Sequence, residues 1–258
     1  MSEDAPEKKS KKKTVTAALL IIGNEVLSGR TQDANLKFLG ENLNHIGIQI
    51  CEARVVPDIT DEIVEALNAL RQRYDYVFTT GGIGPTHDDI TSAAIAKAFG
   101  RKLTRHPEAE ALLRAHYKPE DVTEARLKMS DMPEGAVLIE NPVSKAPGYQ
   151  VENVIVMAGI PSIMQGMFEG FRHRLQGGVT VGSRSITVTI PEGIAAKPLG
   201  AIQNDFPDVE IGSYPFVRDG KVGTSLVARS SDPARLAAAA EAIEAMVRDL
   251  GAEPEEEA

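Results

Sequence analysis

Short apolar runs alternate with segments of helical spacing along the first hundred residues of the chain. Three runs have the length and composition of buried strands, at residues 14–22, 48–56 and 75–80. Between and after them, apolar and capping residues predict helices at 34–46, 60–73 and 89–99. This alternation indicates an α/β fold with a mostly parallel sheet and helices on both faces.

The same unit continues less regularly to residue 176. The pattern predicts two further helices, at 107–116 and 120–130, and two further strands, at 136–139 and 154–157. Val151 is expected in a hairpin that turns at Glu152–Asn153. A helix from Pro161 to about Arg174 completes a domain predicted to span residues 14–176.

A smaller domain is predicted over residues 177–251, after the linker 176-QGG-178. Asp232 is expected to cap its last helix, which has Pro233 in the first turn. The expected elements are a strand at 184–190, a helix near 194–204, strands at 208–214 and 222–229, and a helix at 233–250. The order β-α-β-β-α indicates a small α+β domain.

Composition narrows the class of protein. The chain has 258 residues, 42% of them hydrophobic, and its longest apolar run, 17-AALLII-22, is too short to span a bilayer. Its start is charged and lacks the apolar stretch of a signal peptide, so we expect a cytoplasmic protein with no membrane partner. The single cysteine, Cys51, excludes an internal disulfide framework and a cysteine-rich zinc site. Cys51 is expected to be buried in its strand.

Charge argues against nucleic acid as a partner. The net charge is −9, and the body between the two tails carries −7, whereas nucleic-acid binding usually needs a basic face. Residues 1–13, which contain 8-KKSKKK-13, are predicted to be a disordered basic tail. Residues 252–258, which contain four Glu, are predicted to be a solvated acidic tail.

The most informative segment is the loop 79-TTGGIGPTHDDIT-91, between the third strand and the next helix. Its glycines allow backbone amides to approach a ligand closely, and a helix N-terminus attracts phosphate. Asp88 and Asp89, expected at that N-terminus, would repel a bare phosphate. Either these carboxylates only cap the helix, or a divalent metal bridges them to a phosphate.

Two other loops are expected at the same edge of the sheet. Glu25 follows the first strand, and loops after the first and third strands commonly meet where ligands bind. Asp58 follows the second strand and either caps the next helix or faces the same crevice. In the loop 141-NPVSKAPGYQ-150, Lys145 either contacts an anion or belongs to a rigid crossover.

These residues resemble a known family. The strings 22-IGNEVLSG-29 and 81-GGIGPTHDD-89 resemble the MoaB/Mog molybdopterin-binding fold, and more closely the amino-terminal domain of competence/damage-inducible protein A (CinA). The resemblance covers about residues 15–175. Further landmarks follow in the family's order: Asp33, Asn35, Pro57–Asp58, 141-NPV-143, 146-APG-148, 159-GIP-161 and Met167. The strings 212-GSYP-215 and 223-GTSLVARS-230 resemble the small domain that follows in this group.

The resemblance implies a three-layer α/β fold whose crevice holds a pterin phosphate or a nucleotide, usually with a divalent metal. In molybdopterin adenylyltransferases of this family, two acidic residues are functional. They match Asp58 and Asp89 here, so the resemblance implies that these two residues are catalytic. In CinA-like proteins this domain is associated with hydrolysis of nucleotide diphosphates such as ADP-ribose. A related domain, joined to eukaryotic FAD synthase, is associated with FAD hydrolysis.

The predicted site combines these residues. The phosphate or nucleotide set comprises Gly23, Gly81, Gly82, Gly84, Thr86 and Lys145. The ligands of a divalent metal (Mg, Mn or Co) are predicted to be Glu25, Asp58, Asp88 and Asp89. The predicted partners are a small-molecule nucleotide or pterin phosphate and a second copy of the chain in a homo-oligomer.

Three departures from the family pattern bear on activity. Asn24 stands where the family often has Asp, His87 where it often has Lys or Arg, and Ala158 where it usually has Pro. About 75 residues follow the first domain, so we expect no nicotinamide-nucleotide deamidase activity.

Three functions are compatible with the sequence. The first is a metal-dependent pyrophosphatase acting on ADP-ribose-like or FAD-like substrates, favoured by the clustered acids and the lack of a protein nucleophile. The second is a molybdopterin-binding protein or adenylyltransferase of molybdenum cofactor biosynthesis. The third is a non-catalytic nucleotide-binding module, favoured by Asn24 and His87.

Overall fold

The computed structural model describes residues 14–218 and 220–255, which form two compact units that divide between Gly178 and Val179. The predicted basic tail, residues 1–13, lies outside the described residues. Each unit has its own hydrophobic core, and each is described by itself below.

The first unit is built on a six-stranded sheet in the order β2-β1-β3-β8-β7-β6. Its parallel half consists of β2 (Ile48–Val56), β1 (Val15–Ile22), β3 (Tyr76–Thr80) and β8 (Val154–Met157). The hairpin partner β7 (Gly148–Val151) runs antiparallel to β8 and to β6 (Val137–Ile139). The predicted strands, the hairpin at Glu152–Asn153 and the mostly parallel sheet are confirmed.

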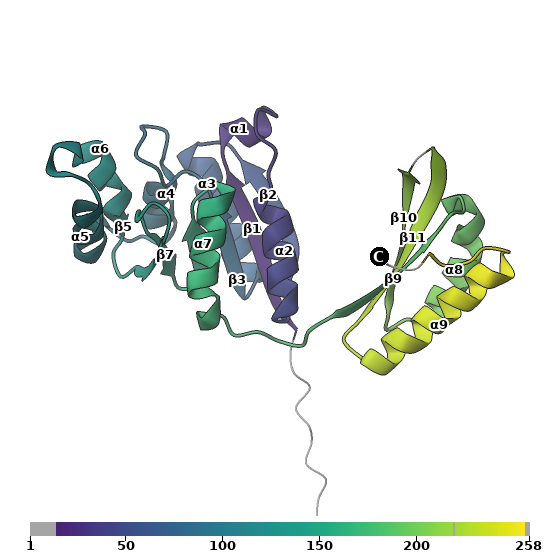
Figure 1. The fold of residues 1–258 in the computed structure, drawn as a ribbon. Helices are drawn as coiled ribbons and strands as arrows, with labels where there is room; N and C mark the ends of the chain where they lie inside the picture. Colours follow the sequence, from purple (N-terminus) through teal and green to yellow (C-terminus); the bar gives the residue numbers. More distant parts are fainter. Residues whose placement is uncertain (1–13, 219, 256–258) are drawn as a thin grey trace, which may run out of the picture. The chain divides into compact units, whose positions relative to one another are not determined.

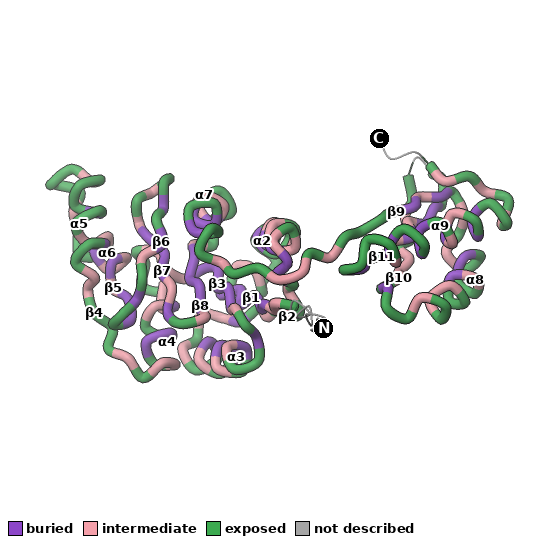
Figure 2. Tube along the Cα trace, turned by 90° about the horizontal axis from the view of Figure 1, so that it is seen from below, coloured by how far each residue is buried: buried purple, intermediate pink, exposed green. Residues whose placement is uncertain are grey.

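Helices cover both faces of this sheet and make three layers (Figures 1 and 2). On one face lie α2 (Asn35–His45) and α7 (Pro161–Phe171), and on the other α3 (Thr60–Arg73) and α4 (Thr91–Ala98). Because side chains alternate along a strand, β1 supplies both cores: Leu19 and Ile21 pack with α2 and α7, and Leu20 and Ile22 pack with α3. This apolar strand holds the first loop in place.

The segment after α4 differs from the prediction. A small sheet of β4 (Leu103–Arg105) and β5 (Asp131–Pro133) was not anticipated, because each strand has three residues. The prediction of one helix at 120–130 is wrong. Three short helical segments follow α5 (Pro107–His116) instead. These are η1 (Pro119–Asp121), α6 (Glu124–Leu127) and η2 (Lys128–Ser130). Thr123 explains the break, since its side chain accepts a hydrogen bond from Arg126 N and starts a new helix there.

Two smaller corrections concern the edge of the sheet. Cys51 is exposed, not buried, because β2 is an edge strand whose side chains alternate between the interior and solvent. A single helical turn, α1 (Asn24–Leu27), follows β1 where the sequence indicated only a loop.

The second unit has the predicted order β-α-β-β-α. Its antiparallel sheet has the order β10-β11-β9, from β9 (Gly182–Val188), β10 (Glu210–Arg218) and β11 (Lys221–Ser230). The helices α8 (Glu192–Asp205) and α9 (Pro233–Asp249) pack on one face of it (Figure 1). The fold class predicted for this unit is therefore confirmed.

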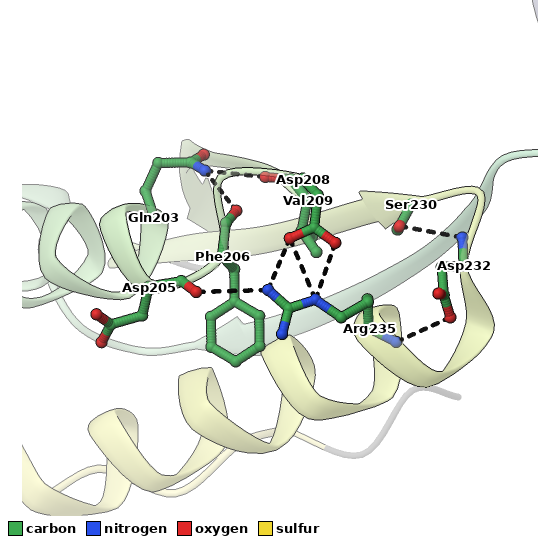
Figure 3. A network of polar contacts seen from close by, with 8 residues as sticks. All are labelled: Gln203, Asp205, Phe206, Asp208, Val209, Ser230, Asp232 and Arg235. Atoms are coloured by element: carbon green, nitrogen blue, oxygen red, sulfur yellow. Dashed lines mark hydrogen bonds and ion pairs between the residues drawn. The ribbon is translucent and has the colours of Figure 1, made fainter.

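A polar network fastens the start of α9 to the end of α8 (Figure 3). Asp232 caps α9 as predicted, because its carboxylate accepts hydrogen bonds from the N–H groups of Ala234 and Arg235. The Arg235 guanidinium makes a bidentate pair with Asp208 and lies 4.6 Å from the centroid of the Phe206 ring. The hydrogen bond from Arg235 holds the pKa of the Asp208 carboxyl below its ordinary value.

The predicted acidic tail is not wholly solvated. Glu255 N donates to Thr187 O at 2.8 Å, and the Glu255 carboxylate accepts from the Thr189 hydroxyl at 2.7 Å, so residue 255 lies against β9. Residues 256–258 lie outside the described part. Across the described ranges, no helix is both long enough and apolar enough to span a membrane.

Candidate functional site

The carboxyl ends of β1, β3 and β8 are neighbours in the sheet, so the loops that follow them meet at one edge. They enclose a pocket of about 530 Å³, a volume typical of a small-molecule site. Glu25 comes from the first loop, Gly81–Asp89 from the second and Ala158–Pro161 from the third. The predicted meeting of Glu25 with the glycine loop is therefore confirmed, and the pocket brings together Glu25, Gly81, Gly82, Gly84 and Asp89.

The glycines of the second loop are required by its geometry. Gly81 has φ +104, and a Cβ there would lie 2.1 Å from the carbonyl oxygen of Ile22. Gly82 has φ +65, and a Cβ there would lie 2.2 Å from the Thr91 hydroxyl oxygen. That hydroxyl donates to Gly81 O at 3.0 Å and fixes the loop on the start of α4. Only glycine combines these backbone angles with such close approach.

The loop leaves three consecutive amides free. Within the described residues, the backbone N–H groups of Gly82, Ile83 and Gly84 donate to no protein acceptor, although Gly81 N donates to Met157 O. All three residues line the pocket. A row of unpaired amides in a glycine-rich loop has the chemistry to bind an anion.

The two aspartates of the motif gather around one hydroxyl. The Thr86 Oγ1 lies 2.5 Å from Asp88 Oδ1 and 2.5 Å from Asp89 Oδ2, and Thr86 N donates to Asp89 Oδ2 at 2.8 Å. The Thr86 hydroxyl, followed by the backbone amide of Asp88, lowers the pKa of the Asp88 carboxyl below its ordinary value. One hydroxyl proton serves only one of these carboxylates at a time, so two negative charges lie close together around Thr86.

Neither aspartate caps the following helix. The helix α4 begins at Thr91 and not at residue 89, and no side chain accepts a hydrogen bond at its N-cap residue, Ile90. Asp89 instead turns back against Gly84, where a Cβ would lie 2.7 Å from its carboxylate. Asp89 lines the pocket, while Asp88 and Thr86 are not among its lining residues and hydrogen-bond to each other within the loop.

Asp58 and Gly23 help to position the first loop, which carries Glu25. The Asp58 carboxylate accepts a hydrogen bond from Asn24 N at 2.9 Å and so holds the start of α1, and Asp58 is not among the pocket residues. A Cβ at Gly23 would lie 2.6 Å from the Glu25 carboxylate, so Gly23 makes room for Glu25. Asp58 thus positions Glu25's turn in this structure and does not itself face the pocket.

Lys145 is exposed and does not line the pocket, although its loop does. The buried Asn141 shapes that loop: its amide donates to Ala146 O at 2.8 Å, and its carbonyl accepts from the N–H groups of Val143 and Ser144. Asn141, Ser144 and Ala146 form this wall of the pocket.

The sequence interpretation missed the residues that the segment after α5 contributes. Tyr117, Arg126 and Met129 line the pocket, and Lys128 donates to Thr86 O at 2.6 Å. The positive charge of Lys128 therefore lies directly beside the glycine loop. A continuous helix was predicted at 120–130, and no motif marks these side chains, so only the fold reveals them.

The acidic side chains decide whether this site suits a divalent metal. No group of three or more His, Cys, Asp or Glu side chains within residues 14–218 and 220–255 is arranged to hold a metal ion. Asp88 and Asp89 nevertheless share one hydroxyl, and Glu25 lines the same pocket as Asp89. One or two carboxylates suit Mg²⁺ when phosphates and water supply its other ligands. Glu25 and Asp89 therefore have the chemistry of donors to a metal whose remaining ligands are phosphate oxygens and water.

Each of the two parts of the chain is similar to a known protein family. Residues 18–177 match the family described as "Probable molybdopterin binding domain", and residues 180–256 match the "FAD synthase, middle domain". A protein of Pyrobaculum calidifontis is 36% identical over 211 residues, which cover 78% of this chain and 80% of that protein. A CinA-like protein of Desulfosudis oleivorans is 34% identical and matches over 76% of this chain and 51% of its own length.

A solved structure agrees with the sequence matches. The crystal structure of the protein CinA from Thermoplasma acidophilum, described as having unknown function, is 35% identical, with a TM-score of 0.60 over 63% of this chain and 99% of that one. The glycine loop described above lies inside the matched family region. The chain therefore belongs to the probable molybdopterin-binding domain family, with the MoaB/Mog-type fold and CinA-like relatives.

Proposed function

We propose that the first unit is a divalent-metal-dependent hydrolase of nucleotide diphosphates, of the ADP-ribose or FAD type. One observation carries this proposal: Gly82, Ile83 and Gly84, whose backbone amides have no protein acceptor, line one pocket together with Asp89. The amides suit a diphosphate, and the carboxylate suits the cation that such a diphosphate carries.

The chain's own residues would divide the work as follows. The free amides hold the phosphate oxygens, and Lys128 adds positive charge behind the loop. Asp89, supported by Thr86 and Asp88, would hold the metal, with Glu25 on the facing loop. A bound Mg²⁺, Mn²⁺ or Co²⁺ polarises a phosphoryl group and lowers the pKa of a bound water. Asp58 serves by positioning the turn that carries Glu25.

Water is the nucleophile that this pocket favours. The hydroxyl-bearing side chains among the described lining residues are Thr31, Tyr117 and Ser144, and none of the other lining residues is a histidine or a lysine. A hydroxyl nucleophile normally needs such a base. His87 stands where the family often has Lys or Arg. Lys128 would supply that positive charge from another part of the chain, because its ammonium group donates to Thr86 O.

The test is AMP release from ADP-ribose and from FAD, measured with Mg²⁺, Mn²⁺ or Co²⁺ and with EDTA. We expect release only with a metal, and a fall of at least about 100-fold in kcat for Asp89→Asn, as is usual when an electrostatic catalytic group is lost. Glu41→Gln is the matched control, since Glu41 is exposed on α2 and pairs only loosely with Lys37. Absence of AMP release with every metal would refute the hydrolase.

The family description favours a second candidate, a pterin-binding role. The same amides would hold the phosphate of a molybdopterin. Co-purification of a fluorescent pterin, lost in Asp89→Asn or on loop disruption, would favour it over the hydrolase. A cytoplasmic location and a homo-oligomer stay predictions; size-exclusion chromatography with light scattering measures the latter.

A further inference from the structure

The pocket has a wall that phosphate chemistry does not use. Tyr117, Arg126 and Met129 come from the segment that connects α5 to β5, and Ile83, Ile163 and Met167 add apolar surface. A diphosphate and its metal have no need of such a surface. The volume, about 530 Å³, also falls among pockets that hold a whole drug-sized ligand, roughly 300–1,000 Å³.

Arg126 is fixed in this wall from two sides. Its guanidinium carbon lies 4.3 Å from the centroid of the Tyr117 ring. Its Nη1 donates to Asp121 O at 2.6 Å and lies 3.4 Å from the Asp121 carboxylate. A planar guanidinium anchored in this way loses little freedom when a ligand ring packs on it.

Tyr117 is anchored as well. It is the C-cap of α5, its N–H donates to Leu113 O at 3.0 Å, and its ring meets the His116 ring edge-on at 4.9 Å between centroids. Both Tyr117 and Arg126 are half-buried. Their flat groups are therefore held in place without being enclosed.

We propose that Tyr117 and Arg126 form the recognition site for the planar heterocyclic ring of the ligand, such as an adenine base, while the glycine loop holds its phosphates. This inference rests on the proposed phosphate site and adds the residues that bind the ring of the same ligand. Aromatic side chains and guanidinium planes bind such rings by stacking. Met129 lines the same pocket, and its neighbour in the chain, Lys128, donates to Thr86 O in the glycine loop.

Calorimetric titration with three probes tests the proposal: ADP with Mg²⁺, inorganic pyrophosphate with Mg²⁺, and adenosine. We expect Tyr117→Leu to weaken ADP and adenosine about 10-fold or more, the usual loss for one stacked base, and to change pyrophosphate less than about 2-fold. Tyr117→Phe should keep the affinity for ADP, since it keeps the ring. Tyr214→Leu, in the second unit, is the matched control because Tyr214 is 52% exposed.

The outcomes separate this proposal from the hydrolase. Unchanged affinity for ADP and adenosine in Tyr117→Leu would overturn the ring site even if AMP release is observed. Equal weakening of ADP and pyrophosphate would assign Tyr117 a structural role and also overturn it. Adenosine binding that depends on Tyr117 would support the ring site even if pyrophosphate fails to bind and the phosphate site is refuted.

Discussion

At the scale of single residues, glycine has two opposite roles in this chain. Gly81 has φ +104, and a Cβ there would lie 2.1 Å from the Ile22 carbonyl oxygen, whereas Gly40 lies inside α2 with open space around it. Gly81→Ala is expected to destabilise the first unit by about 2 kcal/mol or more, because a strained backbone alone costs about 1–3 kcal/mol. Urea unfolding measures the change.

Gly40→Ala is the matched control for this prediction. Alanine in a helix interior is better than glycine by roughly 0.5–1 kcal/mol, so this variant should be more stable than the parent. Destabilisation by both substitutions, or by neither, would contradict the geometry given for the loop.

The sequence predicted site residues best where backbone geometry demands one residue type. Gly81, Gly82 and Gly84 carried that signal, and they line the pocket. Long polar side chains carried no comparable signal. Lys145 lies in a proline-rich loop but is exposed, whereas Lys128 reaches the glycine loop from a segment with no motif. Only the tertiary fold decides which of two lysines approaches a distant loop.

At the scale of elements, capping decides where helices begin. The Asp232 carboxylate accepts from two N–H groups at the start of α9, at 2.9 and 3.2 Å. Asp232→Ala is therefore expected to destabilise the second unit by about 1 kcal/mol, the typical value of an N-cap. Asp249→Asn, at the other end of α9, should be neutral or slightly stabilising, because a negative charge opposes the helix dipole there. Equal losses in both variants, measured by thermal unfolding, would contradict this role of Asp232.

Elements of eight residues or more were predicted to within a few residues, since their patterns are long enough to be unambiguous. The longest error, at 120–130, arose because Thr123 interrupts the apolar spacing with a cap of its own. The burial of Cys51 was also mispredicted, because an apolar strand read alone does not show whether it will lie at the edge of a sheet.

At the scale of the whole molecule, part of the negative charge is concentrated at one loop of the first unit. The chain has a net charge of −9, and in the first unit the carboxylates of Asp88 and Asp89 gather around Thr86, in the same loop as the unpaired amides. The sequence suggested a four-acid metal site, whereas the structure places Asp58 outside the pocket wall, on the turn that precedes Glu25. Contacts of this kind depend on where loops end in space, which spacing along the chain does not specify.

The central claim is that a phosphate enters this pocket only with a cation. The most direct measurement is the affinity for ADP, determined by calorimetry with Mg²⁺ and with EDTA, in the parent protein and in Asp89→Asn. We predict binding at least about 10-fold tighter with Mg²⁺, a gain of about 1.4 kcal/mol, and loss of that difference in Asp89→Asn. Equal affinity for ADP with and without Mg²⁺ in the parent protein would contradict the account.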